Sequence, residues 1–194
     1  MAFSEADLIV QIKAASAKTY TAWNMSLGAY ACPGDAAFLP VLDLLASVHA
    51  AQPDLWIFAA AGNSGALQPH FPAALRHPDT VNSWDIKNPK ARNKAQAASK
   101  ALADVLHGVG SVEVDKNDTP TAKSAFSSCG TWIDSEEPGS SQIATYPAAP
   151  GKTAAQWSGT SFATARATAR FLVATATGNG DKLQVADPKL FSNC

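Results

Sequence analysis

The sequence predicts an α/β fold in which helices flank a mostly parallel sheet. Helical and strand patterns alternate in the first third of the chain and are separated by short turns, as in layered α/β folds. Residues 55–61 (Leu-Trp-Ile-Phe-Ala-Ala-Ala) form a continuous apolar run, which is typical of a strand buried on both faces of a parallel sheet. Ligands bind such sheets at the carboxyl ends of the strands. The residues that follow each strand are therefore the first candidates for a functional site.

The elements of the first third follow from local pattern. Apolar residues recur at helical spacing from Leu8 to Ala15, behind Ser4, which is a favourable N-cap. A second helical pattern ends at Pro53. In order, we expect a helix over 5–17, a strand over 20–27, a loop over 28–35, a helix over 38–50 and a strand over 55–61.

The remaining two thirds alternate polar and apolar segments in the same way. In order, we expect an Ala-rich helix over 95–106, a strand over 109–114, a polar turn over 115–119, a return to the core over 126–133, a polar loop over 135–141, a short strand over 143–146, a loop over 147–153 and a helix that ends at 176. Residues 181–194 have little to pack, and we interpret them as an irregular tail.

Composition narrows the possible partners of the chain. Its 194 residues are enough for one domain, and its net charge of −1 gives no electrostatic reason to expect nucleic acid or a membrane as a partner. No apolar run approaches the roughly 20 residues of a membrane span. The residues after Met1 lack the basic flank and apolar core of a signal peptide, so localisation stays open. Cys32, Cys129 and Cys194 are an odd set, so at least one thiol is left over or pairs outside the chain.

The strongest local signal lies at Ser158-Gly159-Thr160-Ser161, directly before the Ala-rich helix. Ser161 falls in the first turn of that helix, where unpaired backbone N–H groups and the helix dipole favour negative charge. That position suits an attacking oxygen whose reaction creates an oxyanion beside it. It equally suits a serine or threonine cap in front of a core helix.

Two further segments lie at predicted strand ends. Ala60 to Asn63 follows the apolar strand and Ser26 to Gly28 closes the strand before it. The Asn63 side chain could donate an N–H to a developing oxyanion, or it could simply be a turn residue after a strand. Ser26, Leu27 and Gly28 could offer a strand edge for backbone pairing with a peptide, or they could be a strand that runs into a turn.

Together, and in this order, these motifs resemble the subtilisin-like serine proteases, the subtilase family. Gly159 to Ala163 matches the family's Gly-Thr-Ser-x-Ala around the nucleophile, Ala60 to Asn63 matches its oxyanion motif, and Ser26 to Gly28 matches its substrate-binding strand. Residues 71–73, 109–112 and 126–130 also fall in the family's order, so the resemblance covers roughly residues 5–177.

The resemblance implies a serine endopeptidase that hydrolyses peptide bonds through an acyl-serine. It implies Ser161 as nucleophile and Asn63 as oxyanion donor, with a peptide or protein substrate bound by Ser26, Leu27, Gly28, Gly62 and Thr160. No organic cofactor is implied. Family members often hold structural calcium, but we identify no ligand cluster for a metal, and the family's common secretion leaves the localisation open.

The chain departs from the family at its start. The family's Asp-Thr/Ser-Gly and His-Gly-Thr motifs precede the substrate-binding strand, and neither is present in the 25 residues before Ser26. Asp7 is better explained as a helix-start charge. His107-Gly108 resembles the histidine motif but follows the asparagine motif, so it is a poor candidate for the base. We therefore interpret residues 1–194 as a partial peptidase domain that lacks its N-terminal portion.

Two smaller departures follow. Residues 82–107 look inserted, and we expect them to form a surface helix over the core. Ala165-Arg166 replaces the family's Pro-His, and Arg166 with Arg170 would place two charges on one face of a helix that should be buried. That face is either exposed or meets an acidic partner.

Three explanations remain open for the missing aspartate and histidine. The chain is the C-terminal part of a peptidase whose N-terminal segment has been cut off, or a pseudoprotease that binds peptides or proteins without cleaving them. Alternatively it is one half of a split protease, in which a separate chain supplies both residues. On any of these interpretations the chain alone is expected to be inactive, because an unassisted serine hydroxyl is a weak nucleophile.

Overall fold

The computed structural model describes residues 4–32, 34–145, 154–178 and 186–191. Its centre is a five-stranded sheet with the order β1-β3-β5-β6, and β7 also pairs with β5. Strands β1 (Ala22–Met25), β3 (Trp56–Ala60), β5 (Leu106–Val114) and β7 (Ile133–Pro138) are parallel, whereas β6 (Pro120–Lys123) is antiparallel to β5. The prediction of a mostly parallel sheet is therefore confirmed.

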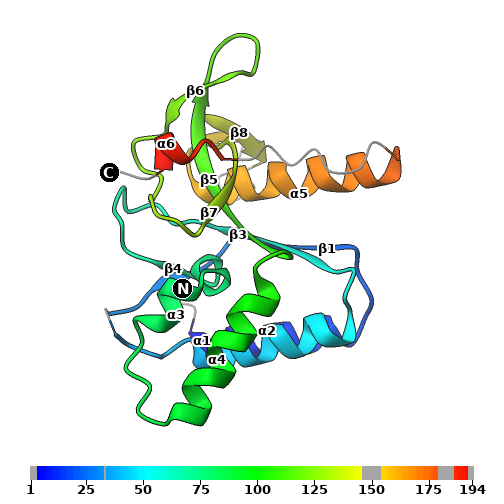
Figure 1. Ribbon diagram of the computed structural model, residues 1–194. Coiled ribbons are helices and arrows are strands. Elements are labelled where there is room, and N and C mark those ends of the chain that lie inside the picture. Colours follow the sequence, from blue (N-terminus) through cyan, green and yellow to red (C-terminus); the bar gives the residue numbers. More distant parts are fainter. Residues whose placement is uncertain (1–3, 33, 146–153, 179–185, 192–194) are drawn as a thin grey trace.

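Helices cover both faces of this sheet (Figure 1). Helices α1 (Glu5–Ser16), α2 (Leu39–Ala51) and α4 (Pro89–Leu102) lie on one face, and α5 (Thr160–Ala176) lies on the other. The apolar run in β3 is buried on both sides because its residues alternate between the two layers. Ile57 belongs to the larger core cluster, and Phe58 packs with residues of α5 in the smaller one.

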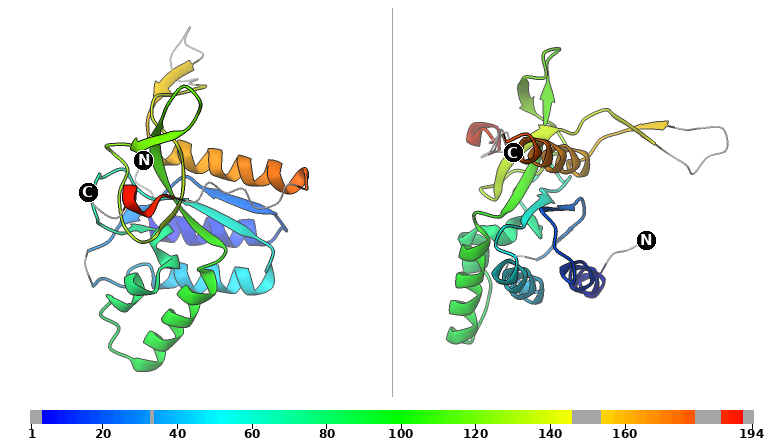
Figure 2. Two further views of the ribbon diagram at one scale, coloured as in Figure 1. Left: turned by 45° about the horizontal axis from the view of Figure 1, so that its top comes forward. Right: turned by 90° about the vertical axis from the view of Figure 1, so that its right-hand side faces the viewer.

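The remaining elements are short. They are β2 (Ala29–Tyr30), which pairs antiparallel with β4 (His70–Phe71), the 3-10 helix η1 (Ala73–Arg76), α3 (Pro78–Asn82), the antiparallel pair β8 (Gln142–Thr145) and β9 (Ala154–Trp157), and α6 (Pro188–Phe191). The β8–β9 pair projects away from the sheet and helices (Figure 2).

The start of α1 confirms the expected cap. Ser4 Oγ accepts a hydrogen bond from the Asp7 backbone N at 3.2 Å, and the Asp7 carboxylate accepts one from the Ser4 backbone N at 3.1 Å. These two bonds form a capping box. Hydrogen bonds from Ser4 lower the pKa of Asp7, so this carboxylate serves the helix start, as the sequence predicted.

The polar loop expected over 135–141 is wrong, because residues up to Pro138 form the largely buried strand β7. Glu137 is only 1% exposed, and its carboxylate pairs with the guanidinium of Arg170. The Arg166 Nε lies 3.7 Å from the same carboxylate, and its Nη2 lies 3.2 Å from Asp118. Both alternatives expected for these arginines apply: their side chains are 40% and 41% exposed, and their acidic partners lie within the chain itself.

Two other boundaries differ from the predictions. The helix expected over 95–106 begins and ends earlier, as α4, and Leu106 and His107 belong to β5. Whether residues 82–107 are an insertion stays a prediction. The tail has more to pack than expected, because Phe191 in α6 is 1% exposed and belongs to the larger core cluster. Residues 181–185 and 192–194 of that tail, and the loop expected over 147–153, lie outside the described residues.

The cysteines are consistent with the expected odd count. Cys129 is disulfide-bonded, and Cys32 is an exposed free thiol.

Candidate active site

The three predicted segments meet where β1 and β3 end and α5 begins. Ser161 Oγ donates to the Ser26 carbonyl at 3.1 Å. In return, Ser26 Oγ lies 2.8 Å from the Ser161 carbonyl oxygen and 2.9 Å from Asn24 Oδ1. Segments 135 positions apart in the sequence are thus joined by a reciprocal pair of hydrogen bonds. This arrangement follows from the parallel sheet, which puts the carboxyl ends of β1 and β3 at one edge.

Thr160 connects the end of β3 to the start of α5. Its Oγ1 donates to Asn63 Oδ1 at 2.9 Å and accepts from the Gly62 backbone N at 3.2 Å. Its backbone N donates to the same Asn63 Oδ1 at 2.8 Å. Thr160 is completely buried, so its hydroxyl is part of the framework of the site.

These bonds also fix the orientation of the Asn63 amide. A backbone N–H can only donate, so the atom that faces Thr160 N must be the amide oxygen, and Nδ2 points the other way. The position that a Cβ on Gly159 would occupy lies 3.5 Å from Asn63 Nδ2 and 3.8 Å from Ser161 N. Apart from Gly159 and its chain neighbours, no heavy atom of the described residues lies nearer to that position. Two nitrogen atoms, Asn63 Nδ2 and Ser161 N, therefore lie near one point in front of Gly159, and Asn63 Oδ1 lies 3.9 Å from the same point.

Three side chains that the sequence analysis did not predict lie against the backbone of Gly62, and they belong to Tyr30, His70 and Ser128. His70 also lies against Gly28. A Cβ on Gly62 would lie 2.6 Å from Tyr30 Oη, 2.7 Å from Ser128 Oγ and 2.9 Å from His70 Cγ, and Gly62 has a φ of +106°. Tyr30 Oη accepts a hydrogen bond from the Asn63 backbone N at 2.9 Å and lies 3.3 Å from Ser128 Oγ. The only sequence signal for this support was that residues 71–73 and 126–130 fell in the family's order.

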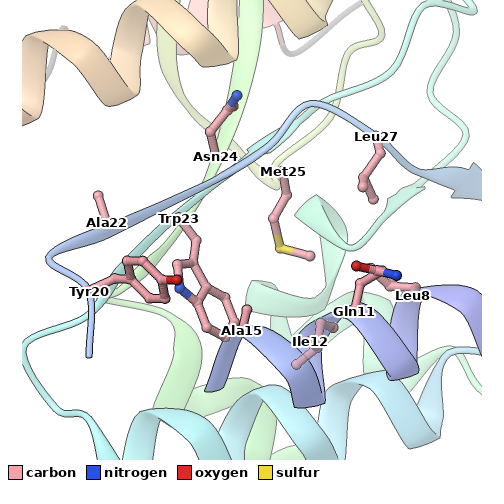
Figure 3. A pocket seen from close by; sticks show the side chains of 10 residues that line it. All are labelled: Leu8, Gln11, Ile12, Ala15, Tyr20, Ala22, Trp23, Asn24, Met25 and Leu27. Carbon is pink, nitrogen blue, oxygen red and sulfur yellow. The ribbon is translucent and has the colours of Figure 1, made fainter. Parts of the chain in front are cut away.

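Leu27 has a different position from its predicted neighbours. Its side chain lines a mostly apolar cavity of about 290 Å³ between α1 and β1 (Figure 3). Ile12, Trp23 and Met25 line the same cavity, and the indole Nε1 of Trp23 is buried without a hydrogen-bond partner among the described residues. The side of β1 away from β3 pairs with no other described strand. The cavity therefore runs along an unpaired sheet edge.

No described histidine or carboxylate bonds to Ser161. His107, which the sequence analysis considered a poor candidate for the base, bonds to Asp134 Oδ2 through Nδ1 at 2.7 Å. Its ring stacks on Trp56 with ring centroids 4.9 Å apart. It pairs in register with Phe58, four residues before Gly62, which places it about 13 Å along the strand from the site. Arg76 lies 3.1 Å from Asp134 as well, so this histidine belongs to a structural cluster.

Metal-binding clusters and membrane-spanning helices are both absent from the described part of the chain. No group of three or more His, Cys, Asp or Glu side chains there is placed to hold a metal ion. None of the described helices has the length and apolar character needed to cross a membrane.

Comparisons with known proteins identify the family and the fold of the chain. The sequence model of the subtilase family matches residues 1–187, whereas the comparison with curated proteins gives no match. Among solved structures, the chain is similar to the prenylagaramide maturation protease PagA, with a TM-score of 0.55 and 21% identity over 94% of this chain and 54% of that one.

Two more structures have the same level of similarity. For the self-cleaved protease domain of PatA the TM-score is 0.54, with 22% identity over 96% of this chain and 56% of that one. For a cold-adapted subtilisin-like serine proteinase the TM-score is 0.56, with 21% identity over 92% of this chain and 50% of that one. These similarities show the fold, and the chain spans about half the length of each structure.

Proposed function

The chain belongs to the subtilase family, and we propose that it carries the nucleophile and the oxyanion-binding part of a serine endopeptidase. The observation that carries the proposal is the meeting of Ser161, the Asn63 amide and the end of β1 at one point. Ser161 would attack a peptide carbonyl and form an acyl-serine, which water then hydrolyses.

The negative charge of that reaction has a place to form. Asn63 Nδ2 and the Ser161 backbone N both lie near the point in front of Gly159, and the N-terminus of α5 adds the positive end of its helix dipole. A substrate strand along Ser26 to Gly28 would bring its carbonyl to Ser161, because the Ser26 carbonyl is already within 3.1 Å of Ser161 Oγ. The hydrogen bond from the Gly62 backbone N to Thr160 Oγ1 helps to hold the donors in place.

The proton of Ser161 needs an acceptor, and we propose that a further polypeptide segment supplies it as a histidine oriented by an aspartate. The unpaired edge of β1 and the cavity beside it are where such a segment would add to the sheet. The segment is either covalently joined to this chain or a separate chain. The half-length coverage of the similar structures supports the need for it.

A second candidate function is peptide binding without cleavage. It is favoured by one observation, which is that Ser161 Oγ bonds to a backbone carbonyl and to no described base. Against it, two bonds from Thr160 hold the Asn63 amide by its oxygen and leave its Nδ2 near the point in front of Gly159, an arrangement that peptide binding alone does not require.

Labelling with a fluorophosphonate, read by intact mass, separates the two functions. The purified chain would be tested alone and after fusion to the N-terminal half of a subtilisin-like protease that carries the aspartate and histidine motifs. We expect labelling of the fusion that disappears in Ser161→Ala and is strongly reduced in Asn63→Ala. A folded fusion that takes no label would refute the peptidase proposal and favour the binding module. Labelling of the chain alone would refute the need for a second segment.

A further inference from the structure

The Ser26 hydroxyl lies between two neighbours that could accept its proton, and it has only one proton to give. Its Oγ lies 2.8 Å from the Ser161 carbonyl oxygen and 2.9 Å from the Asn24 side-chain amide. A backbone carbonyl can only accept a hydrogen bond, whereas a side-chain amide can turn over and present its nitrogen instead of its oxygen. All three groups are satisfied when Asn24 Nδ2 donates to Ser26 Oγ and Ser26 Oγ donates to the Ser161 carbonyl.

These two bonds, which we call the relay, run from the edge strand of the sheet to the helix that carries Ser161. Asn24 is an exposed residue of β1, and its side chain points to the side of the strand opposite Trp23 and Met25 (Figure 3). Ser26 follows β1 directly, and Ser161 lies in the first turn of α5. The relay therefore joins the carboxyl end of β1 to the start of α5.

The two bonds between Ser26 and Ser161 have different fates in the proposed reaction. Ser161 Oγ donates to the Ser26 carbonyl at 3.1 Å, and this bond must break when the proton of Ser161 passes to the base. The bond from Ser26 Oγ to the Ser161 carbonyl involves no reacting atom, so it persists while Ser161 attacks. Since a misplacement of about 1 Å can lower a reaction rate by roughly 100-fold, a bond that persists at this point matters for the rate.

We propose that Ser26 and Asn24 are positioning residues for the attack by Ser161. The proposal rests on the proposed function, in which Ser161 attacks a peptide carbonyl. Ser26 Oγ holds the Ser161 carbonyl during the attack, and Asn24 Nδ2 directs the single Ser26 proton toward that carbonyl. Both side chains act on the reaction only through the position of Ser161, so their removal lowers the rate of the covalent step and leaves the affinity for the reagent unchanged.

NMR of the chain itself tests the relay without requiring any reaction. A carbonyl carbon that loses a hydrogen bond moves upfield, so the Ser161 carbonyl-carbon resonance reports the bond from Ser26. We expect an upfield shift in Ser26→Ala and also in Asn24→Asp, because a carboxylate has no proton to give and takes the Ser26 proton for itself. Ser26→Thr keeps the hydroxyl and should keep the parent resonance. The matched control is Ser47→Ala on α2, which removes a serine hydroxyl that donates to the Asp43 carbonyl at 2.8 Å, and it should leave Ser161 unshifted.

Fluorophosphonate labelling of the fusion tests the positioning role. Rates measured over a range of reagent concentrations separate the maximal rate of labelling from the concentration that half-saturates it. We expect Ser26→Ala to lower the maximal rate at least about fivefold, which corresponds to the loss of one hydrogen bond, with the half-saturating concentration unchanged. Ser26→Thr should restore the rate. Asn24→Asp should also lower the rate, but should have no further effect in the Ser26→Ala background, because it acts through Ser26.

Several results would overturn the proposal. They are an unshifted Ser161 resonance in Ser26→Ala or Asn24→Asp, an unchanged maximal rate in folded Ser26→Ala, and a loss that appears only in the half-saturating concentration. A further loss from Asn24→Asp in the Ser26→Ala background would show that the new charge acts through space, and would refute the role of Asn24. If Ser26→Ala does not fold, Asn24→Asp at its exposed position decides both measurements. A shifted resonance with an unlabelled parent fusion keeps the relay and refutes the peptidase, whereas a labelled fusion with an unshifted resonance does the reverse.

Discussion

Replacing Thr160 by valine isolates the hydroxyl that joins the end of β3 to the start of α5. Valine has the same shape, so the completely buried site keeps its packing and loses only the polar contacts of Oγ1. One lost contact is the bond to Asn63 Oδ1, worth about 1 kcal/mol. The other leaves the buried Gly62 N–H without its acceptor, which costs about 1–3 kcal/mol. We expect Thr160→Val to lower the free energy of unfolding by about 2–4 kcal/mol.

Thr164→Val is the matched control on the same helix. Thr164 is also completely buried, and its hydroxyl donates to the Thr160 carbonyl at 2.7 Å. That carbonyl lies inside α5 and can still accept the helical bond from the backbone N of residue 164, so no buried group loses its only partner. Its cost should stay below about 1 kcal/mol.

Urea unfolding followed by tryptophan fluorescence measures both variants, and Thr160→Ser should recover most of the loss because it restores the hydroxyl. In the fusion described above, Thr160→Val should also reduce fluorophosphonate labelling, since one of the two bonds that orient the Asn63 amide is gone. Equal destabilisation by Thr160→Val and Thr164→Val would refute the assignment of a special role to the Thr160 hydroxyl.

Three other predictions concern the stability of the folded chain. Because burial lowers the pKa of His70, protonation of this histidine favours the unfolded chain. The free energy of unfolding should therefore keep its full value above about pH 6.5 and fall by up to about 1.4 kcal/mol per pH unit below it. Urea unfolding from pH 7.5 to 5 should show this slope, and His70→Gln should remove it. Asp134→Ala removes the partner of Arg76 and His107 and should cost about 3 kcal/mol in the same assay, whereas an effect below about 0.5 kcal/mol would contradict the cluster. Phe191→Ala should cost about 3–5 kcal/mol if α6 is part of the core, and a neutral result would place it outside.

Features that depend on neighbours in the sequence could be predicted. The cap of α1 involves Ser4 and Asp7, which are three residues apart. The continuous apolar run of β3 is enough to predict a buried strand. The motifs placed Ser161, Asn63 and Ser26 at strand and helix ends, and the structure brings them together there. Local pattern was enough because each of these residues is positioned by the element it follows or begins.

Features that depend on distant partners could not be predicted in this way. Glu137 has the polarity of a loop residue, and it is tolerated inside a strand only because Arg170, 33 positions later, neutralises it. Tyr30 and His70 support the site through β2 and β4, two-residue strands that exist only because they pair with each other. Neither strand is long enough to have a periodicity that a sequence pattern could reveal.

Hydrogen bonds among the described residues support one part of the proposed reaction and leave another part without support. Bonds between described residues of this chain fix the orientation of the Asn63 amide and the position of Ser161. A further bond joins the Gly62 backbone N to Thr160 Oγ1. The step that removes the proton from Ser161 has no such support among those residues. A segment added along β1 would lie beside Asn24, whose side chain bonds to the Ser26 hydroxyl, and that hydroxyl also bonds to the Ser161 carbonyl. Under the proposed function, binding at that edge would therefore affect the position of Ser161 through Asn24 and Ser26.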